Sequence, residues 1–415
     1  MEEKRSGENG GFLKGLFCGV LLVLICLAGA LFCYRWKLNR TLEQLQARRQ
    51  EELLQEEPET EDTLELDGEK IDQKMEEIQE LINFYYLDPI DSEDVEKGIY
   101  EGMVSGLDDP YSVYYSWEDL EKLTESTSGE YLGIGAVVAQ DPETGTITIV
   151  RCFEDTPSYE AGLQAGDILT TLNGEEITGV ELSKVIARIK TEPGDAVTLG
   201  YYRDGEEGEA QVERRSIQIP TVEWEMLDDG IGYLEILEFD TITVEQFQSA
   251  MKSLEEEGME KLIIDVRDNP GGTLQSVCDI LDELLPDGLM VYTEDKYGHR
   301  EEYTSDAAHQ FTKPLAVLVN ENSASASEVF SGAVKDYGLG TLVGTTTFGK
   351  GIVQRVYNLS DGSGVKLTVA KYYTPNGNDI HGKGITPDIE VEPDEETEED
   401  DQLQAAIDIL NQSND

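Results

Sequence analysis

The chain has 415 residues, of which 39% are hydrophobic, so it is long enough for two or three domains with cores of their own. Its net charge of −56 argues against nucleic acid and anionic membrane surfaces as partners, because like charges repel. The chain has only three histidines, and Cys152 and Cys278, the two cysteines outside an N-terminal apolar run, fit no metal spacing. The composition therefore predicts a globular protein without a metal site.

The N-terminal residues predict a membrane anchor. Residues 16–34 contain no charged side chain, and an apolar stretch of this length crosses a bilayer as a helix. We predict a short tail at 1–11, a transmembrane anchor at 12–34 and a charged stalk at 35–68. A signal-peptidase site at Ala28-Gly29-Ala30 is the alternative, but the apolar run continues past it.

Residues 69–125 predict a small helical region. In "IDQKMEEIQELINFYYLD" apolar residues recur at helical spacing, and "SEDVEKGIYEGMVSGL" predicts a second helix with Ser92 as a possible cap. Two interpretations remain open. The helices belong to a core, which is favoured, or they form a dimer contact.

Residues 126–215 alternate short β-rich runs with two short helices. The order of these elements, including "AGLQAGDILTTLNG", resembles a PDZ domain of the bacterial protease type. PDZ domains add a chain end to a sheet edge and hold its carboxylate with backbone amides. The resemblance assigns that carboxylate loop to Leu132, Gly133 and Ile134, where glycine permits close approach; the alternative is that the glycines only allow a strand bend.

Residues 216–392 alternate strands and helices, which predicts an α/β core with at least partly parallel pairing. An acidic linker and a closing helix follow at 393–415. The predicted strand "KLIIDVRD" ends in a glycine turn, and "PLAVLVN" ends just before "ENSASASE". Because sites form at the carboxyl ends of parallel strands, we expect the two segments to converge on one cleft.

The serines at 323, 325 and 327 have two interpretations. In the first, they are small residues of which one caps the helix, because serine is a good N-cap. In the second, one of them is a nucleophile at the helix N-terminus, where free backbone amides would hold the oxyanion that develops on the attacked carbonyl. Lys350 lies between two glycines, in a segment that nearly fits a phosphate-binding loop. A glycine replaces the final hydroxyl residue of that loop and a β-branched run replaces its helix, so nucleotide binding is disfavoured.

Together, "DVRDNPGG", "NENSASASE", "FGKGIVQ" and "IHGKGITPD", behind a PDZ domain, resemble the carboxy-terminal processing (tail-specific) proteases, which are Ser/Lys endopeptidases. The resemblance covers the chain from about residue 70 to its end. Together with the anchor predicted from the apolar run, it gives an α/β multidomain protein with a single N-terminal transmembrane helix, a small helical region, a β-rich PDZ domain with two helices and an α/β protease core.

The resemblance also implies roles for single residues. It makes Ser325 the nucleophile, Lys350 the general base and Gln354 a support for the lysine. The oxyanion donors it implies are the backbone amides of Ala326 and of Gly271 or Gly272. A lysine accepts a proton only when neutral, so Lys350 needs a lowered pKa, which desolvation provides.

The partners implied are protein or peptide substrates with accessible C-termini and the lipid bilayer, without nucleic acid or a cofactor, and a homodimer is possible. The family faces outward from the membrane, which gives an extracytoplasmic catalytic domain. More lysine and arginine follow the anchor than precede it, which alone favours the opposite orientation, but large domains cross largely regardless of such charges. The main alternative function is an inactive PDZ scaffold that only binds chain ends.

Overall fold

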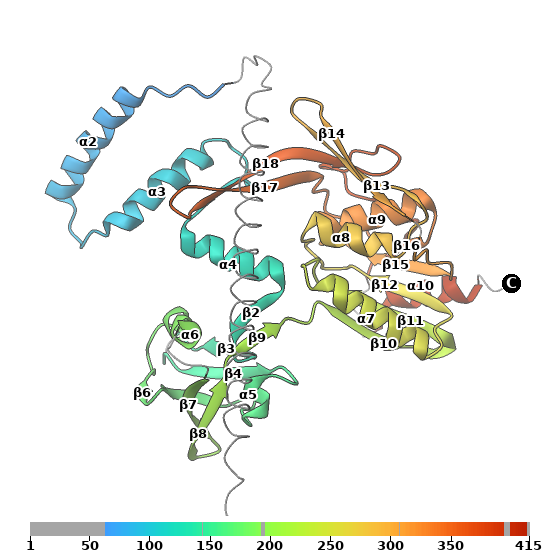
Figure 1. The fold of residues 1–415 in the computed structure, drawn as a ribbon, viewed down its shortest axis with the longest axis horizontal. Helices are drawn as coiled ribbons and strands as arrows, with labels where there is room; N and C mark the ends of the chain where they lie inside the picture. Colours follow the sequence, from blue (N-terminus) through green and yellow to red (C-terminus); the bar gives the residue numbers. More distant parts are fainter. Residues whose placement is uncertain (1–62, 143, 192–195, 307, 394–398, 413–415) are drawn as a thin grey trace, which may run out of the picture. The chain divides into compact units, whose positions relative to one another are not determined.

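The computed structural model describes residues 63–415 except 143, 192–195, 307, 394–398 and 413–415 (Figure 1). The anchor predicted at 12–34 and most of the stalk lie outside the described residues. Within the described part, every helix is too short or too polar to cross a membrane. Contacts divide the chain into two units, Met1–Ile90 and Asp91–Asp415.

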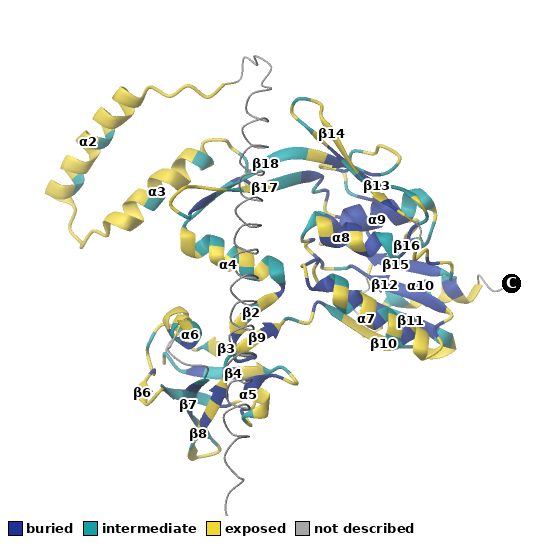
Figure 2. Ribbon diagram, in the orientation of Figure 1, coloured by how far each residue is buried: buried dark blue, intermediate teal, exposed yellow. Residues whose placement is uncertain are grey.

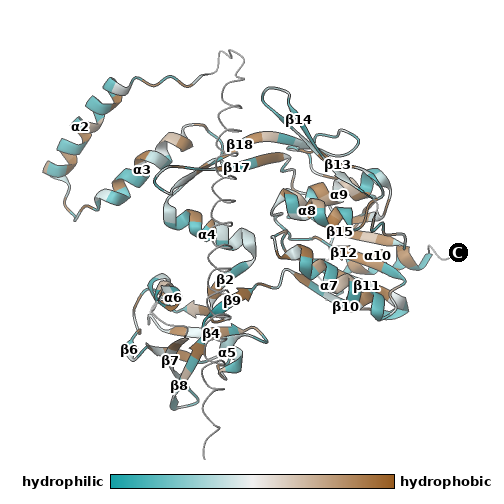
Figure 3. Ribbon diagram, viewed as in Figure 1, coloured by the Kyte–Doolittle hydropathy of each residue, from teal (hydrophilic) through white to brown (hydrophobic). Residues whose placement is uncertain are grey.

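The described part of the first unit is one helix, α2 (Gly68–Tyr85). The carboxylate of Asp67 begins it by accepting a hydrogen bond of 3.1 Å from the amide of Lys70, as expected of an N-cap. Figure 3 shows hydrophobic and hydrophilic residues alternating along α2. No residue of α2 is buried, so the helix is confirmed but its assignment to a core is wrong.

The second unit begins with α3 (Ser92–Ser105), β1 (Val113–Tyr115) and α4 (Trp117–Ser128). The predicted helix is present, but Ser92 is its first residue and not its cap. The N-cap is Asp91, whose carboxylate accepts from the Glu93 amide at 2.9 Å, and the helix too buries no residue. Strand β1 pairs antiparallel with β18 (Gly364–Tyr373), which lies far along the chain. The short strand thus ties this N-terminal segment to the C-terminal third of the protein.

Residues 130–218 form the β-rich part with two helices that the sequence predicts. The six-stranded sheet has the order β3-β4-β5-β7-β8, with β6 paired to β5, and its core is aliphatic. A separate pair, β2 and β9, joins the two ends of this segment. The bounds are β2 Glu130–Gly133, β3 Ala136–Gln140, β4 Ile147–Cys152, α5 Pro157–Glu160, β5 Ile168–Leu172, β6 Glu175–Glu176, α6 Leu182–Thr191, β7 Ala196–Arg203, β8 Glu206–Glu213 and β9 Arg215–Gln218.

The α/β core contains a six-stranded sheet of order β10-β11-β12-β15-β16-β19. Strands β11, β12, β15, β16 and β19 are parallel and β10 is antiparallel, which confirms the predicted pairing. Every residue of β12 and β15 is buried, as in a sheet covered on both faces (Figure 2). The bounds are β10 Val222–Met226, η1 Asp228–Gly230, β11 Ile231–Ile236, β12 Lys261–Asp265, β15 Leu315–Val319, β16 Thr341–Gly344 and β19 Ile389–Glu390.

Helices cover both faces of this sheet. Successive residues of a strand point to opposite faces, so Leu262 and Ile264 pack into the cluster that holds α7, α8 and α9. Ile263, between them, packs instead with Ala406 and Leu410 of the closing helix. The bounds are α7 Thr243–Glu256, α8 Leu274–Asp282, α9 Ala326–Tyr337 and α10 Asp401–Gln412.

A second sheet of five strands was not predicted. It has the order β1-β18-β13-β14, with β17 also paired to β18. Its remaining members are β13 (Gly288–Asp295), β14 (Arg300–Ser305) and β17 (Ile352–Asn358). Because β17 begins two residues after Lys350, this sheet holds the segment that follows the predicted base.

Phe330 on α9 offers a test of the core, because it is fully buried and its ring centre lies 6.1 Å from that of Phe239. Phe330→Ala is expected to lower the free energy of unfolding by about 3–5 kcal/mol through lost burial and a cavity. Phe84→Ala, at a side chain that is 78% exposed, is the control and should change it little. Calorimetry of both variants checks this, and equal effects would contradict the described core.

Candidate active site

The turn after β12 and the loop after β15 lie side by side. The two strands are parallel neighbours, and the register pairs Asp265 with Leu318 near their carboxyl ends. The Ser323 hydroxyl donates to the Val266 carbonyl at 2.7 Å, and the Ser327 hydroxyl donates to the Asn269 carbonyl at 2.9 Å. The expected convergence of the two segments is therefore confirmed, and two of the three serines bind them together.

The middle serine, Ser325, is the N-cap residue of α9. Its backbone has φ 56° and ψ −111°, a conformation that costs energy for a residue with a side chain. Gly271 packs against it, since a Cβ added at Gly271 would lie 2.8 Å from the Cβ of Ser325. Only glycine fits at this close approach, so the glycine turn and Ser325 form one packed unit.

Backbone amides surround Ser325. The amide of Gly271 donates to Oδ1 of Asn269 at 2.8 Å. The amides of Gly272 and Ala326, in contrast, have no acceptor within the described residues. Ala326 is the first residue of α9, where helix amides lack intrahelical partners. Two N–H groups are thus free to bind an anionic oxygen.

Glu328 joins the serine loop to the lysine loop. This fully buried carboxylate accepts hydrogen bonds from the amides of Ser325 at 2.9 Å, Gly349 at 2.7 Å and Lys350 at 2.8 Å. The Thr347 hydroxyl donates to it as well, at 2.7 Å. The sequence analysis missed Glu328. The pattern Ser-x-x-Glu at 325–328, which is that of a capping box, was the available signal.

Tyr372 on β18 makes a second connection between the same two loops. Its hydroxyl lies 2.9 Å from the carbonyl oxygen of Ser325 and also contacts that of Lys350. Burial raises the pKa of this phenol, so it remains a hydrogen-bond donor. Side chains from α9 and β18 therefore fix the backbones of Ser325 and Lys350 relative to each other.

The Lys350 side chain is half-buried. Desolvation lowers its pKa, the charge of Lys366 lowers it further, and Glu328 opposes both effects. The ammonium nitrogen lies 4.8 Å from the ring centre of Tyr111, and no hydrogen bond in the described chain joins it to Ser325 Oγ. The lowered pKa has the direction and the main cause that the sequence analysis required of a base.

Gln354 lies on β17, beside a register shift between Val353 and Gln354 in its pairing with β18. Its side-chain amide donates to the Ile352 carbonyl at 3.3 Å, which is a bond within its own strand. Support of Lys350 by Gln354 stays a prediction.

The turn after β12 is held by an ion-pair cluster. Arg267 donates to Asp265 through Nη2 at 2.6 Å and to Asp400 through Nη2 at 2.8 Å. The Tyr233 hydroxyl donates to Asp265 at 2.8 Å. These side chains order the turn by hydrogen bonding.

The predicted carboxylate loop lies at the start of the PDZ segment. Leu132 and Gly133 end β2, where Gly133 pairs with Arg215. Ile134 is buried, and its carbonyl accepts from the Ser158 amide at 2.8 Å. Strand β3 follows at once, and in the described sheet it pairs only with β4, so its other edge is open.

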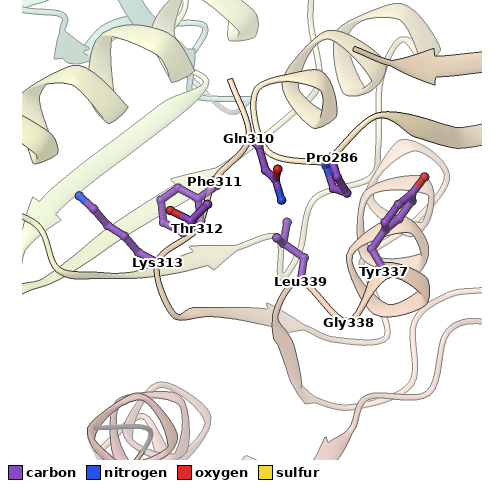
Figure 4. A pocket seen from close by; sticks show the side chains of 8 residues that line it. All are labelled: Pro286, Gln310, Phe311, Thr312, Lys313, Tyr337, Gly338 and Leu339. Carbon is purple, nitrogen blue, oxygen red and sulfur yellow. The ribbon is translucent and has the colours of Figure 1, made fainter. Parts of the chain in front are cut away.

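A pocket of about 340 Å³ lies away from these residues (Figure 4). Its lining includes Tyr337 and Gly338, at the end of α9 opposite to Ser325, together with Phe311 and Lys313. The described residues hold no cluster of three or more His, Cys, Asp or Glu suited to a metal ion. The lining of the pocket includes neither Ser325 nor Lys350, so the pocket is separate from the loops that carry them.

Three regions of the chain match known families. Residues 230–391 match peptidase family S41, residues 130–213 match the PDZ domain, and residues 24–119 match the activating protease CtpB N-terminal domain.

Similar proteins cover most of the chain. The carboxy-terminal processing protease CtpB of Bacillus subtilis (strain 168) is 38% identical over 328 residues, which are 77% of this chain and 68% of that protein. A probable CtpA-like serine protease of Staphylococcus epidermidis is 36% identical over 77% of this chain and 65% of its own length. The chain thus spans about two thirds of these relatives.

The carboxyl-terminal-processing protease of Synechocystis is 36% identical over 75% of each chain. Among solved structures, the photosystem II D1 C-terminal processing protease aligns with 82% of this chain and 91% of its own, at 29% identity and a TM-score of 0.47. The extent and identity of these sequence matches confirm the resemblance seen in the motifs. The chain belongs to peptidase family S41, the carboxy-terminal processing serine proteases, and carries a PDZ domain.

Proposed function

We propose that this protease cleaves its substrates with Ser325 as nucleophile and Lys350 as general base. The observation that carries the proposal is the carboxylate of Glu328, which binds the amides of both residues. Ser325 stands at the N-terminus of α9 in a strained conformation, and Lys350 is half-buried with a lowered pKa. A serine is nucleophilic when a neutral base is close enough to accept its proton.

The reaction follows from these positions. Neutral Lys350 accepts the hydroxyl proton as Ser325 Oγ attacks the peptide carbonyl carbon, and the protonated lysine then gives that proton to the leaving amine. The amides of Ala326 and Gly272 bind the oxyanion. Gly272 is favoured over Gly271 because the Gly271 amide is already bonded to Asn269. Water activated by Lys350 releases the acyl group from Ser325.

The PDZ segment gives this protease its preference for chain ends. The open edge of β3 is available for an added substrate strand, and Leu132, Gly133 and Ile134 lie just before it, separated from it by Gly135. In this binding mode the terminal carboxylate lies against amides of that loop.

The protein is anchored by residues 12–34 with its catalytic part outside the cytoplasm. The uncharged run at 16–34 supports the anchor, and the orientation rests on the resemblance described above. Homodimer contact through α2 and α3 is also part of the proposal. It is supported by exposed apolar residues on both helices, including Leu81 at 58% and Met103 at 58% exposure.

Ser325→Ala and Lys350→Ala should each abolish cleavage of an unfolded protein that ends in apolar residues, because the nucleophile or its base is missing. Gel-based cleavage assays check this, with circular dichroism to establish folding. Cleavage by Lys350→Ala at the parent rate would show that another group is the base. A parent that binds the chain end without cleaving it would favour the scaffold alternative.

Glu328→Gln should lower kcat/KM about 10- to 100-fold. One carboxylate oxygen becomes an NH₂ group facing two donors, and the charge-assisted bonds to both loops are lost. The matched control is Glu321→Gln, an exposed acid in the same loop that accepts from Thr345 at 3.0 Å. If the two variants cleave equally well, Glu328 does not position the dyad.

Lys366→Gln should move the acid limb of the pH–rate profile to higher pH. The reaction needs neutral Lys350, so the rate falls as pH drops through the Lys350 pKa, which desolvation lowers from its ordinary value. Removing the positive charge of Lys366 raises that pKa. Lys371→Gln, at an exposed position of the same strand, is the control. A limb that stays in place or moves down contradicts the assignment.

A further inference from the structure

Lys350 is contacted by a residue from outside the region that matches family S41. Tyr111 lies between α3 and β1, in the region that matches the CtpB N-terminal domain, whereas the S41 match covers 230–391. Its ring centre lies 4.8 Å from the Lys350 nitrogen, within the distance at which a ring face attracts a cation. Within the described residues, the Tyr111 ring is the group that contacts the Lys350 ammonium.

Hydrogen bonds hold the backbone at Tyr111 and Ser112 from two directions. The carboxylate of Asp109 accepts from the Tyr111 amide at 3.0 Å and from the Ser112 hydroxyl at 2.6 Å. Ser112 Oγ in turn accepts from the Thr368 amide of β18 at 3.2 Å. Strand β1, which follows directly, pairs with β18. The backbone that carries the Tyr111 ring is thus attached through Ser112 and β1 to β18, the strand that carries Tyr372.

Three charged or aromatic groups act on the Lys350 nitrogen from different elements. The ring of Tyr111 stabilises the protonated form, and the carboxylate of Glu328 on α9 acts in the same direction. Lys366 on β18 acts against it, and Lys366 itself lies 5.4 Å from the ring centre of Tyr115. The Lys350 and Lys366 nitrogens therefore each lie over a tyrosine ring, and both tyrosines belong to the segment 111–115.

We propose that Tyr111 is a positioning residue for the catalytic base. Its ring holds the resting ammonium of Lys350 apart from Ser325, and the neutral amine leaves the ring face to accept the Ser325 proton. The N-terminal helical region thereby supplies a part of the active site that the S41 region lacks. This inference rests on the proposed function of Lys350.

The test compares Tyr111→Leu with Tyr111→Phe in the full-length protein. Leucine keeps an apolar group beside Lys350 but removes the ring face, whereas phenylalanine keeps the ring. In a Ser325→Ala background, the rate of Lys350 acetylation by acetic anhydride, followed by mass spectrometry across pH, reports the ionisation of this amine without any need for activity. The same two substitutions in the active enzyme give the pH–rate profile of cleavage.

With Tyr111→Leu, both titrations are expected to move about 0.4 to 0.7 pH unit lower, because the ammonium loses its cation–π partner. Tyr111→Phe should stay with the parent. An unchanged or upward-shifted Lys350 titration in a folded Tyr111→Leu protein overturns the proposal. If acetylation shifts as expected while the cleavage profile does not, Tyr111 binds Lys350 but Lys350 is not the base, so the proposed function fails instead.

Discussion

The candidate site depends on one buried carboxylate. Glu328 lies on the first turn of α9 and accepts four hydrogen bonds, three of them from the backbone amides of Ser325, Gly349 and Lys350. A carboxylate buried without donors would be costly, so these bonds also explain why the side chain is tolerated in the interior. Because the donors belong to both loops, the bonds that satisfy the carboxylate also fix the backbones of Ser325 and Lys350 relative to each other.

The same geometry answers an electrostatic difficulty. A carboxylate near Lys350 favours the protonated amine, whereas a general base must be neutral to accept a proton. Glu328, however, binds the Lys350 backbone amide, while the side-chain nitrogen lies over the Tyr111 ring. Desolvation and the charge of Lys366 then lower the pKa despite Glu328. Backbone and side chain of one residue thus meet different environments.

The parts that meet here come from distant points of the sequence. Strand β18 pairs with β1, β13 and β17, and it carries Tyr372, Thr368 and Lys366. It thereby connects the N-terminal helical region to the segment after Lys350. In the sequence, the PDZ segment lies between α4 and β10, the first strand of the α/β core. Its sheet packs around an aliphatic cluster of its own. The PDZ domain and the α/β core therefore have separate hydrophobic clusters.

The sequence by itself determined the elements whose pattern is local: the parallel strands β11, β12, β15 and β16, the helices between them, and the serine and glycine turns at the strand ends. Hydrophobic periodicity and turn residues encode these directly. Its motifs also predict the roles of Ser325 and Lys350. Only the tertiary structure revealed the second sheet, the four bonds to Glu328 and the contact between Tyr111 and Lys350. These contacts join residues that are far apart in the chain. The sequence around a buried glutamate or a partly exposed tyrosine has no local pattern that predicts which distant residue it will contact.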